Sequence, residues 1–425
     1  MRLQKEIESG GRLPNVDEEM KKTVAKLHTK ILIGLLLLAS PVVPLQAQQA
    51  EAKSQSAAPQ TWWKNEVQVR LDEAEENSDE LRTALQQVKY EHRRALEFLI
   101  EHMPSSDLKV LKADYLLNNI DLAYQAINQV PWGKQISEDI FFNDILPYAN
   151  VDETREDWRG EMMKRCLPLV AECKTPGEAA LKLNRELFPL IDVRYSRKRK
   201  KANQSPSESM ELSCASCTGL SIILIDACRS VGVPSRLAGI PSWTNKRGNH
   251  TWVEVWDNDD WHFTGAAEPA DQLNQAWFQN DASLANNDEA RHRIYAVSYA
   301  RTGLHFPMVW APRSRQANAI NVTERYTGKP AKAAESETQT LISIFSADGN
   351  RIKREVTVTF ATEETALNGT TRDESADMND MLMLVLPRDQ KFTVTWNEED
   401  GPRSFERSTA DAEQTSWEFR LQGKK

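Results

Sequence analysis

The feature that most constrains the fold is a change of pattern after Ser213. Residues 218–231 read TGLSIILIDACRSV, an apolar run that predicts one helix. The segments after this run are RLAGI, HTWVEVW, WHFTG and RIYAVSYA, whose aromatic and β-branched residues predict consecutive β-strands. A helix followed by a group of strands is typical of an α+β protein, and this is the fold class we expect.

The segments on either side of this region have different patterns. Between Trp62 and about Leu190, apolar residues recur at helical spacing among charged ones, which predicts a helical region. Residues 194–213 begin with a basic cluster and continue with Ser, Pro and Asn, and they predict a flexible loop. Beyond about Ala311, short alternating segments separated by Gly, Asn and Asp predict a small β-sandwich. The expected organisation is therefore a linker at 48–60, a helical N-terminal region at 61–190, a core at 191–300 and a β-sandwich-like C-terminal domain at 311–425.

Charge and cysteine content limit the possible functions. The chain has 425 residues with 53 Lys and Arg against 62 Asp and Glu, a formal net charge of −9. Nucleic acid is not expected as a partner, because binding it requires a basic footprint. Five cysteines are too few for a disulfide scaffold, and the odd number leaves at least one thiol unpaired within the chain.

The first 47 residues are typical of a secretory signal peptide. The apolar run ILIGLLLLASPVV at 31–43 follows several lysines and precedes LQA, which ends at Ala47. Acidic residues at 17–19 do not suit a signal peptide, and translation from Met20 would remove them. We therefore expect a secreted or periplasmic protein with no stable membrane span after cleavage. An uncleaved anchor is the alternative, although the run is short for a membrane span.

Cys217 is the candidate nucleophile. It begins the apolar helix, and Ser216 before it is a plausible N-cap. The positive end of the helix dipole and the unpaired N–H groups there favour a thiolate, which is the reactive form of cysteine. The same N–H groups could stabilise an oxyanion that forms when a thiolate attacks an amide carbonyl.

His250 is the candidate base. It begins the predicted strand HTWVEVW, where it can lie beside the start of the helix. A neutral imidazole at this place can accept the thiol proton and later protonate a leaving amine. A third group is needed to orient the imidazole, and the next strand, WHFTG, is the expected source.

These residues resemble the transglutaminase-like superfamily of papain-like cysteine enzymes. In that family the nucleophilic Cys opens a helix that ends in a G-[IV]-P-x-R turn, which here is Gly232 to Arg236. The family's His begins an H-x-W-V-E strand, which here runs from His250 to Glu254. The resemblance covers roughly residues 170–300. It implies a papain-like transglutaminase core of a helix and an antiparallel sheet at 191–300, and a cysteine protease, amidase or acyltransferase activity through a thioester.

The chain departs from the family at the third catalytic position. The family usually carries an Asp four residues after the Trp of the third strand, but Gly265 stands there in this chain. Glu268, three residues later, is the acid that we expect to orient His250, and the peptide:N-glycanase branch has an acid at a corresponding place. The alternative is that Glu268 caps a local turn and a neutral group orients the imidazole.

Two further residues are candidates for substrate binding. Trp243 could line a substrate groove, although ordinary packing would also explain it, and Asn249 might donate a hydrogen bond near the site. A protein or peptide substrate is expected, with no cofactor and no metal. The oligomeric state does not follow from the sequence.

Other functions are compatible with parts of the sequence. Cys214 and Cys217 form a C-x-x-C pair, but no strand of a βαβ unit leads into it, which disfavours a redox role. A zinc site would need a second cysteine or histidine pair at suitable spacing, which is absent. The main alternative is a non-catalytic scaffold that binds a surface polymer or a protein through a degenerate papain-like core.

Overall fold

The computed structural model describes residues 61–245, 248–327, 336–360, 365–412 and 414–421. The predicted signal peptide at 1–47 and the linker at 48–60 lie outside these residues. Within the described ranges, none of the helices combines the length and the apolar character that crossing a membrane would require.

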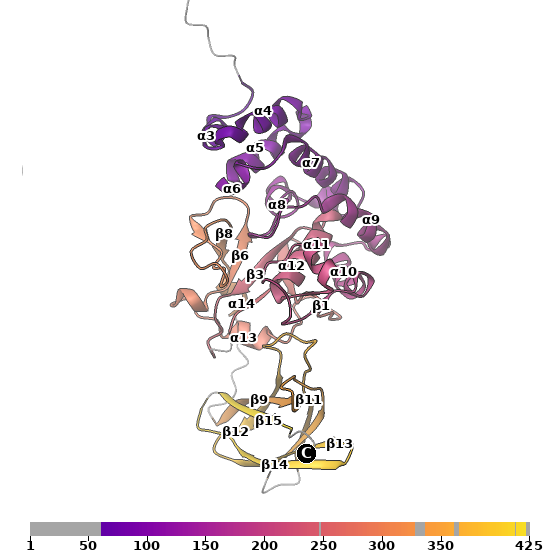
Figure 1. The fold of residues 1–425 in the computed structure, drawn as a ribbon, viewed down its shortest axis with the longest axis vertical. Coiled ribbons are helices and arrows are strands. Elements are labelled where there is room, and N and C mark those ends of the chain that lie inside the picture. Colours follow the sequence, from indigo (N-terminus) through magenta and orange to yellow (C-terminus); the bar gives the residue numbers. More distant parts are fainter. Residues whose placement is uncertain (1–60, 246–247, 328–335, 361–364, 413, 422–425) are drawn as a thin grey trace, which may run out of the picture. The chain divides into compact units, whose positions relative to one another are not determined.

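The N-terminal region is built from amphipathic helices around one apolar core (Figure 1). Leu81 and Leu85 of one helix and Leu96 and Leu99 of another are at most 1% exposed, as their helical spacing predicts. Ser137 accepts a hydrogen bond from the N–H of Ile140 and so caps the last helix of the group. The helices are α3 (Asn65–Glu73), α4 (Ser78–Gln87), α5 (Arg93–His102), α6 (Ser105–Leu108), α7 (Ala113–Asn128) and α8 (Glu138–Asp144).

Two further helices, α9 (Arg159–Val170) and α10 (Pro176–Ile191), lead into the central core. Thr175 caps α10 by accepting the N–H of Glu178, and Pro176 occupies the first turn, where its missing N–H costs nothing. The apolar face of α10 is buried in the same cluster as the helix that carries Cys217.

Residues 194–213 are more ordered than the predicted flexible loop. Their ends pair as two short parallel strands, β1 (Arg194–Tyr195) and β2 (Cys214–Ala215), and α11 (Pro206–Leu212) lies between them. The prediction was wrong because it overlooked a helix start at Ser205. The Ser205 hydroxyl accepts the N–H of Glu208, whose carboxylate accepts the N–H of Ser205, and this reciprocal pair is a capping box.

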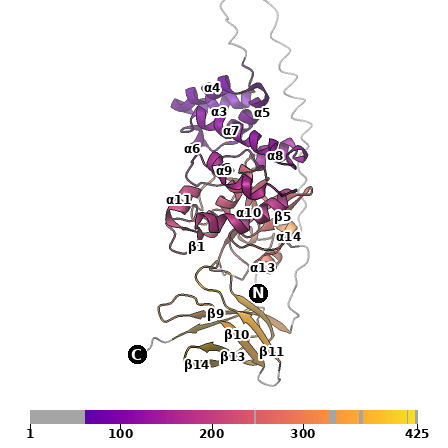
Figure 2. The same cartoon turned by 90° about the vertical axis from the view of Figure 1, so that its right-hand side faces the viewer.

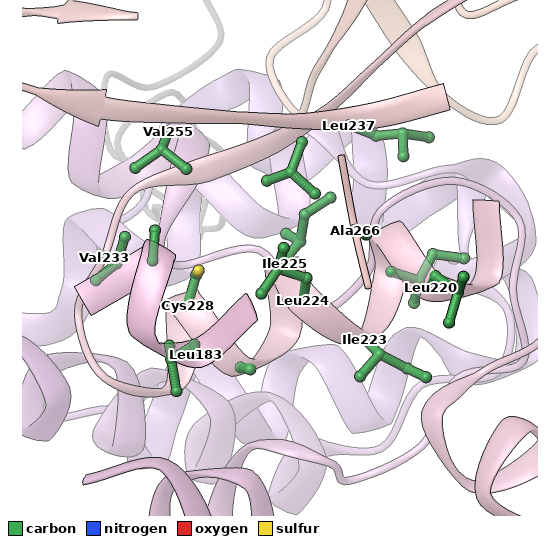
Figure 3. Packing of buried hydrophobic residues seen from close by; sticks show 14 of the residues in the cluster. Leu183, Leu220, Ile223, Leu224, Ile225, Cys228, Val233, Leu237, Val255 and Ala266 are labelled. Carbon is green, nitrogen blue, oxygen red and sulfur yellow. The ribbon is translucent and has the colours of Figure 1, made fainter. Parts of the chain in front are cut away.

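The central helix α12 (Cys217–Ser230) is almost wholly buried, as its apolar sequence predicts. Figure 3 shows its side chains Ile223, Leu224 and Ile225 among those of Leu183 from α10 and Val233 from the turn that follows. The helix is followed by Gly232, whose φ of +69° favours glycine and allows the chain to turn into the sheet.

A six-stranded antiparallel sheet packs against α12. Its strand order is β5-β4-β3-β6-β8-β7, so His250 lies on a strand inside the sheet and pairs with Ile240. Alternation along β4 places Val253 and Val255 in the core cluster of α12 and turns Trp252 to the opposite face. The strands are β3 (Ser235–Ile240), β4 (His250–Asp257), β5 (Asp260–Thr264), β6 (Tyr295–Ser298), β7 (Leu304–His305) and β8 (Asn318–Asn321). In the sequence, the helix α13 (Gln279–Ser283) lies between β5 and β6, and the helix α14 (Thr323–Tyr326) follows β8.

The C-terminal domain consists of two sheets that enclose their own core (Figure 2). One sheet has the order β11-β10-β13-β14 and is antiparallel, and the other has the order β12-β9-β15, in which β9 and β15 are parallel. Phe392, Val394 and Trp396 alternate along β13 and are at most 2% exposed. The strands are β9 (Glu337–Phe345), β10 (Glu355–Phe360), β11 (Ala366–Thr370), β12 (Leu382–Pro387), β13 (Lys391–Glu398), β14 (Gly401–Ser408) and β15 (Gln414–Arg420).

The described elements confirm the predicted α+β fold class. A helix and an antiparallel sheet form the centre, helices precede them, and a β-sandwich-like domain follows.

Candidate active site

Cys217 is the first residue of α12, where the sequence predicts it. Ser216 caps the helix by accepting a hydrogen bond of 3.1 Å from the N–H of Gly219. The Ser216 hydroxyl also donates to the carbonyl of Ala202, which ties the start of α12 to the segment before α11. The thiol is therefore held at the N-terminus of a rigid, buried helix.

His250 is the first residue of β4 and its side chain is 1% exposed. Aromatic rings enclose its imidazole: the ring centroid lies 4.8 Å from that of Trp277, 5.0 Å from that of Phe278 and 5.9 Å from that of Trp252. This enclosure restricts the orientation of the imidazole and excludes water from around it.

Asp377 is a third residue at the site, and it was not found by reasoning from the sequence. It lies in the loop between β11 and β12 of the C-terminal domain, and its Oδ2 is 3.7 Å from Nδ1 of His250. Its side chain is 2% exposed. One nitrogen of His250, the Sγ of Cys217 and a carboxylate oxygen of Asp377 all lie within 4.8 Å of one another.

The surroundings of Cys217, which is partly exposed, raise the pKa of its thiol. Burial raises the pKa of Cys217 to about 12, and the Asp377 carboxylate acts in the same direction, whereas hydrogen bonding with Thr251 lowers the pKa. The sequence predicts a thiolate from the helix N-terminus alone. The pKa is raised instead, because the free-energy cost of removing a charged sulfur from water exceeds the stabilisation that the partial charge at a helix N-terminus provides.

Glu268 occupies the space that Gly265 leaves open. A Cβ atom at position 265 would overlap Oε2 of Glu268, so the Glu268 carboxyl group lies against the backbone where the resembled family carries its Asp. Burial raises the pKa of Glu268 well above its usual value, and the Asp377 carboxylate adds to this, whereas the Trp277 indole acts in the opposite direction.

The two candidate substrate-binding residues have different environments. Trp243 is fully buried and stacks on Trp252, with their ring centroids 6.2 Å apart and an angle of 5° between the planes. Trp243 thus takes part in ordinary core packing, which the sequence analysis gave as the alternative to lining a substrate groove. The backbone carbonyl of Asn249 accepts a hydrogen bond of 2.9 Å from Nδ2 of Asn379, in the same loop as Asp377.

A cavity of about 500 Å³ reaches Asp377, and its lining residues include neither Cys217 nor His250. The core and the loop of the C-terminal domain both contribute to its walls, and Asp377 lines it together with Glu268 and Trp277. The remaining lining residues are Tyr195, Leu220, Ala266, Ala267, Pro269, Ala270, Gln275, Ala276, Ser375, Ala376 and Asp380.

A buried ion-pair network supports the strand of His250. The Glu254 carboxylate accepts hydrogen bonds of 2.7 Å from Nε of Arg236 and from Nη1 of Arg325. It also accepts one of 2.9 Å from the hydroxyl of Tyr326, which in turn accepts the indole N–H of Trp252. Because Trp252 stacks beside His250, this network reaches the imidazole.

All five cysteines are free, so Cys214 and Cys217 are not joined. The grouping of Cys217, His250 and Asp377 brings together thiol, imidazole and carboxylate donors. Donors of these types are suited to nucleophilic and acid–base chemistry and are also those that bind metal ions.

Several solved structures resemble this chain. A candidate cysteine protease from Cytophaga hutchinsonii is 11% identical, with 67% of this chain and 68% of that one covered and a TM-score of 0.28. For the transglutaminase of red sea bream the identity is 9%, the coverages are 66% and 65%, and the TM-score is 0.29. A candidate protease from Parabacteroides distasonis is 9% identical, with 68% of this chain and 52% of that one covered and a TM-score of 0.23. The chain thus spans about two thirds of the length of the first two proteins and about half of the third.

The sequence comparisons give one further result. No curated protein matches the chain. Residues 164–265, which run from α9 to the end of β5 and include Cys217 and His250, match the family model of the transglutaminase-like superfamily.

Proposed function

We propose that this protein is a cysteine acyl-transfer enzyme that acts on peptide or carboxamide bonds. The observation that carries the proposal is the position of Cys217 at the N-terminus of α12, with its Sγ within 4.8 Å of a nitrogen of His250. A cavity of about 500 Å³, lined by Asp377 together with Glu268 and Trp277, offers space for a substrate.

The reaction would begin with transfer of the thiol proton from Cys217 to His250. The sulfur then attacks the carbonyl carbon, and the oxyanion that forms accepts hydrogen bonds from N–H groups at the start of α12. As the C–N bond breaks, the imidazolium returns its proton to the leaving amine and a thioester remains on Cys217. Water or an amine resolves the thioester, with hydrolysis or acyl transfer as the result.

In this proposal Glu268 is a positioning residue. It fills the place of the missing Asp beside Gly265 and lines the same cavity as Asp377. Its carboxyl group would keep the imidazole of His250 in the orientation that the proton transfers need. Asn249 and the wall of the cavity would hold the substrate, which we propose to be a protein or a peptide outside the cytoplasm.

The test is to incubate the purified full chain with a peptide library, with and without a primary amine, and to analyse the products by mass spectrometry. Cleavage or deamidation indicates hydrolysis, and an amine adduct indicates transfer. We expect Cys217→Ala to abolish every product, whereas Cys214→Ser is the matched thiol control and should retain activity. Equal activity of Cys217→Ala and the unchanged protein would refute the proposal.

The raised pKa of Cys217 favours a second candidate function, a scaffold whose core is no longer catalytic. Reaction of the thiol with iodoacetamide separates the two candidates. An enzyme should show alkylation of Cys217 that depends on His250, so that His250→Ala changes its rate. A scaffold should show slow alkylation that His250→Ala leaves unchanged, together with no product from the peptide library.

A further inference from the structure

The loop that carries Asp377 is held by one buried arginine. Arg351 is 8% exposed, and its guanidinium donates hydrogen bonds of 2.6 to 3.4 Å to carbonyl oxygens around the loop. Its acceptors are the carbonyls of Asp373, Ala376, Asp377, Met378 and Asp380. A guanidinium with this many acceptors gives the loop one conformation, so the position of the Asp377 carboxylate is built into the C-terminal domain.

The same loop is attached to the core by two hydrogen bonds. The N–H of Met378 donates a hydrogen bond of 3.1 Å to the hydroxyl of Tyr195, at the end of β1. Nδ2 of Asn379 donates one of 2.9 Å to the carbonyl of Asn249, the residue immediately before His250. The two residues that directly follow Asp377 thus attach the loop to the core, and the Asp377 carboxylate approaches His250 from the second domain.

Asp377 approaches His250 from the side of the thiol. A single nitrogen of His250 lies within 4.8 Å of both the Sγ of Cys217 and a carboxylate oxygen of Asp377, and these last two atoms are also within 4.8 Å of each other. A carboxylate that only orients an imidazole contacts the nitrogen remote from the nucleophile. Asp377 instead faces the nucleophile and the base together.

We propose that Asp377 is a third residue of the active centre, supplied by the C-terminal domain, that holds a proton on the thiol of Cys217 and on the imidazole of His250 at once. The inference rests on the proposed function and adds one step to it, because the imidazolium must release its proton to water before His250 can accept the proton of the thiol. A negative charge disfavours the thiolate and favours the imidazolium, so the state with both groups protonated gains most. The thiolate–imidazolium pair gains little, because attraction to one member is offset by repulsion from the other.

Other charged groups also face this centre. The Arg199 guanidinium lowers the pKa of Cys217 slightly, and thus opposes Asp377. The hydroxyl of Tyr195 has its pKa raised by burial, by Asp377 and by Cys217, so it stays neutral. Asp380, in the same loop, forms an ion pair of 2.9 Å with Arg372. Burial raises the pKa of Glu268, and its carboxyl group lies against Gly265, so Asp377 is the acidic residue whose approach to both the thiol and the imidazole the structure shows.

The test compares the unchanged full-length protein with Asp377→Asn. The pH dependence of iodoacetamide alkylation at Cys217, followed by peptide mass spectrometry, reports the titration of the thiol, and NMR of labelled histidine reports that of His250. We expect both titrations to move to lower pH by about one unit or more in Asp377→Asn. Alkylation at neutral pH should then become roughly tenfold faster, because one pKa unit changes the thiolate fraction about tenfold.

Asp377→Asn and its control, Asp380→Asn, each replace a carboxylate of the same loop by an amide of similar shape. An Asn at 377 can still accept the N–H of Asn379, which now donates to Oδ1 of Asp377 over 2.8 Å. Asp380→Asn removes a carboxylate from the same loop that is paired with Arg372, and we expect it to leave both titrations in place. Equal shifts in the two variants would refute the proposal, because a disturbed loop would then explain them.

Two further results would overturn the proposal. If the His250 titration moves alone, Asp377 is an ordinary orienting carboxylate. If Asp377→Asn does not fold, the unchanged protein still decides: a thiol that titrates at or below about 8.5, the ordinary value for cysteine, contradicts the inference. None of these measurements requires turnover, so failure of the proposed function would appear separately, as a lack of products from the peptide library.

Discussion

Replacement of Glu254 by Gln tests whether the ion-pair network beneath His250 stabilises the core. Glu254 is fully buried, and it accepts hydrogen bonds of 2.7 Å from both Arg236 and Arg325. Glutamine has the same shape but no charge. Arg236, whose side chain is 5% exposed, would then be left without its anion.

The size of the effect can be worked out from these distances. At an effective dielectric constant of about 20, two unit charges 2.7 Å apart attract by about 6 kcal/mol, and Glu254 has two such partners. The cost of burying the carboxylate offsets several kcal/mol of this attraction. Removal of one member of a buried pair costs about 3–5 kcal/mol in practice, and we expect a loss in this range.

The assay is equilibrium urea unfolding followed by tryptophan fluorescence. Glu289→Gln is the matched control, because Glu289 also pairs with an arginine, Arg291, at 2.7 Å, but both side chains are more than half exposed. Exposed pairs of this kind contribute about 0–1 kcal/mol. A difference below about 1 kcal/mol between the two variants would refute the reasoning, since burial would then have no effect on what the pair contributes.

The same network predicts a dependence of stability on pH. Although burial raises the pKa of Glu254, Arg236 and Arg325 outweigh it, so the pKa in the folded protein is lowered. A lowered pKa stabilises the fold above the unfolded value of about 4.3, and this stabilisation is lost as the pH falls through the folded value. The deficit of Glu254→Gln should therefore be largest at neutral pH and shrink below about pH 4.

Variants at three further positions test separate parts of the structure. Ser216→Ala removes the cap of α12 and should lower the free energy of unfolding by about 1 kcal/mol in the same assay. Leu224→Ala opens a cavity in the fully buried core and should cost about 2–5 kcal/mol. Glu268→Gln should retain most of the peptide-library activity because the raised pKa of Glu268 favours its neutral form, whereas Glu268→Ala should lower kcat. A large loss in Glu268→Gln would show that the ionised form is required.

The parts of the site that depend on local sequence were predictable. The helix that begins at Cys217 follows from its apolar run and its cap, and the strand that begins at His250 follows from its aromatic and β-branched residues. Both elements have lengths and boundaries that short-range patterns determine. The helix at 206–212 was missed, although its Ser205–Glu208 capping box is visible in the sequence.

Asp377 could not be predicted in this way. Its loop contacts the core across 130 residues of sequence, between Asn379 and Asn249, and no motif marks the acid that reaches the site. The protonation of Cys217 was mispredicted for a related reason. A helix N-terminus is visible in the sequence, but the burial of the thiol and the approach of a carboxylate from another domain are not.

Glu268 and Asp377 cannot exchange roles, although both carboxyl groups lie at the same cavity. Glu268 is packed against Gly265, where burial raises its pKa and favours the neutral form, and a neutral carboxyl group can form hydrogen bonds but exerts no net charge on the imidazole. Asp377 approaches the thiol and the imidazole from the loop that Arg351 shapes. In our two proposals, orientation of the imidazole and protonation of the centre belong to carboxyl groups from different domains, so changes in the C-terminal domain should alter thiol reactivity without altering the catalytic core.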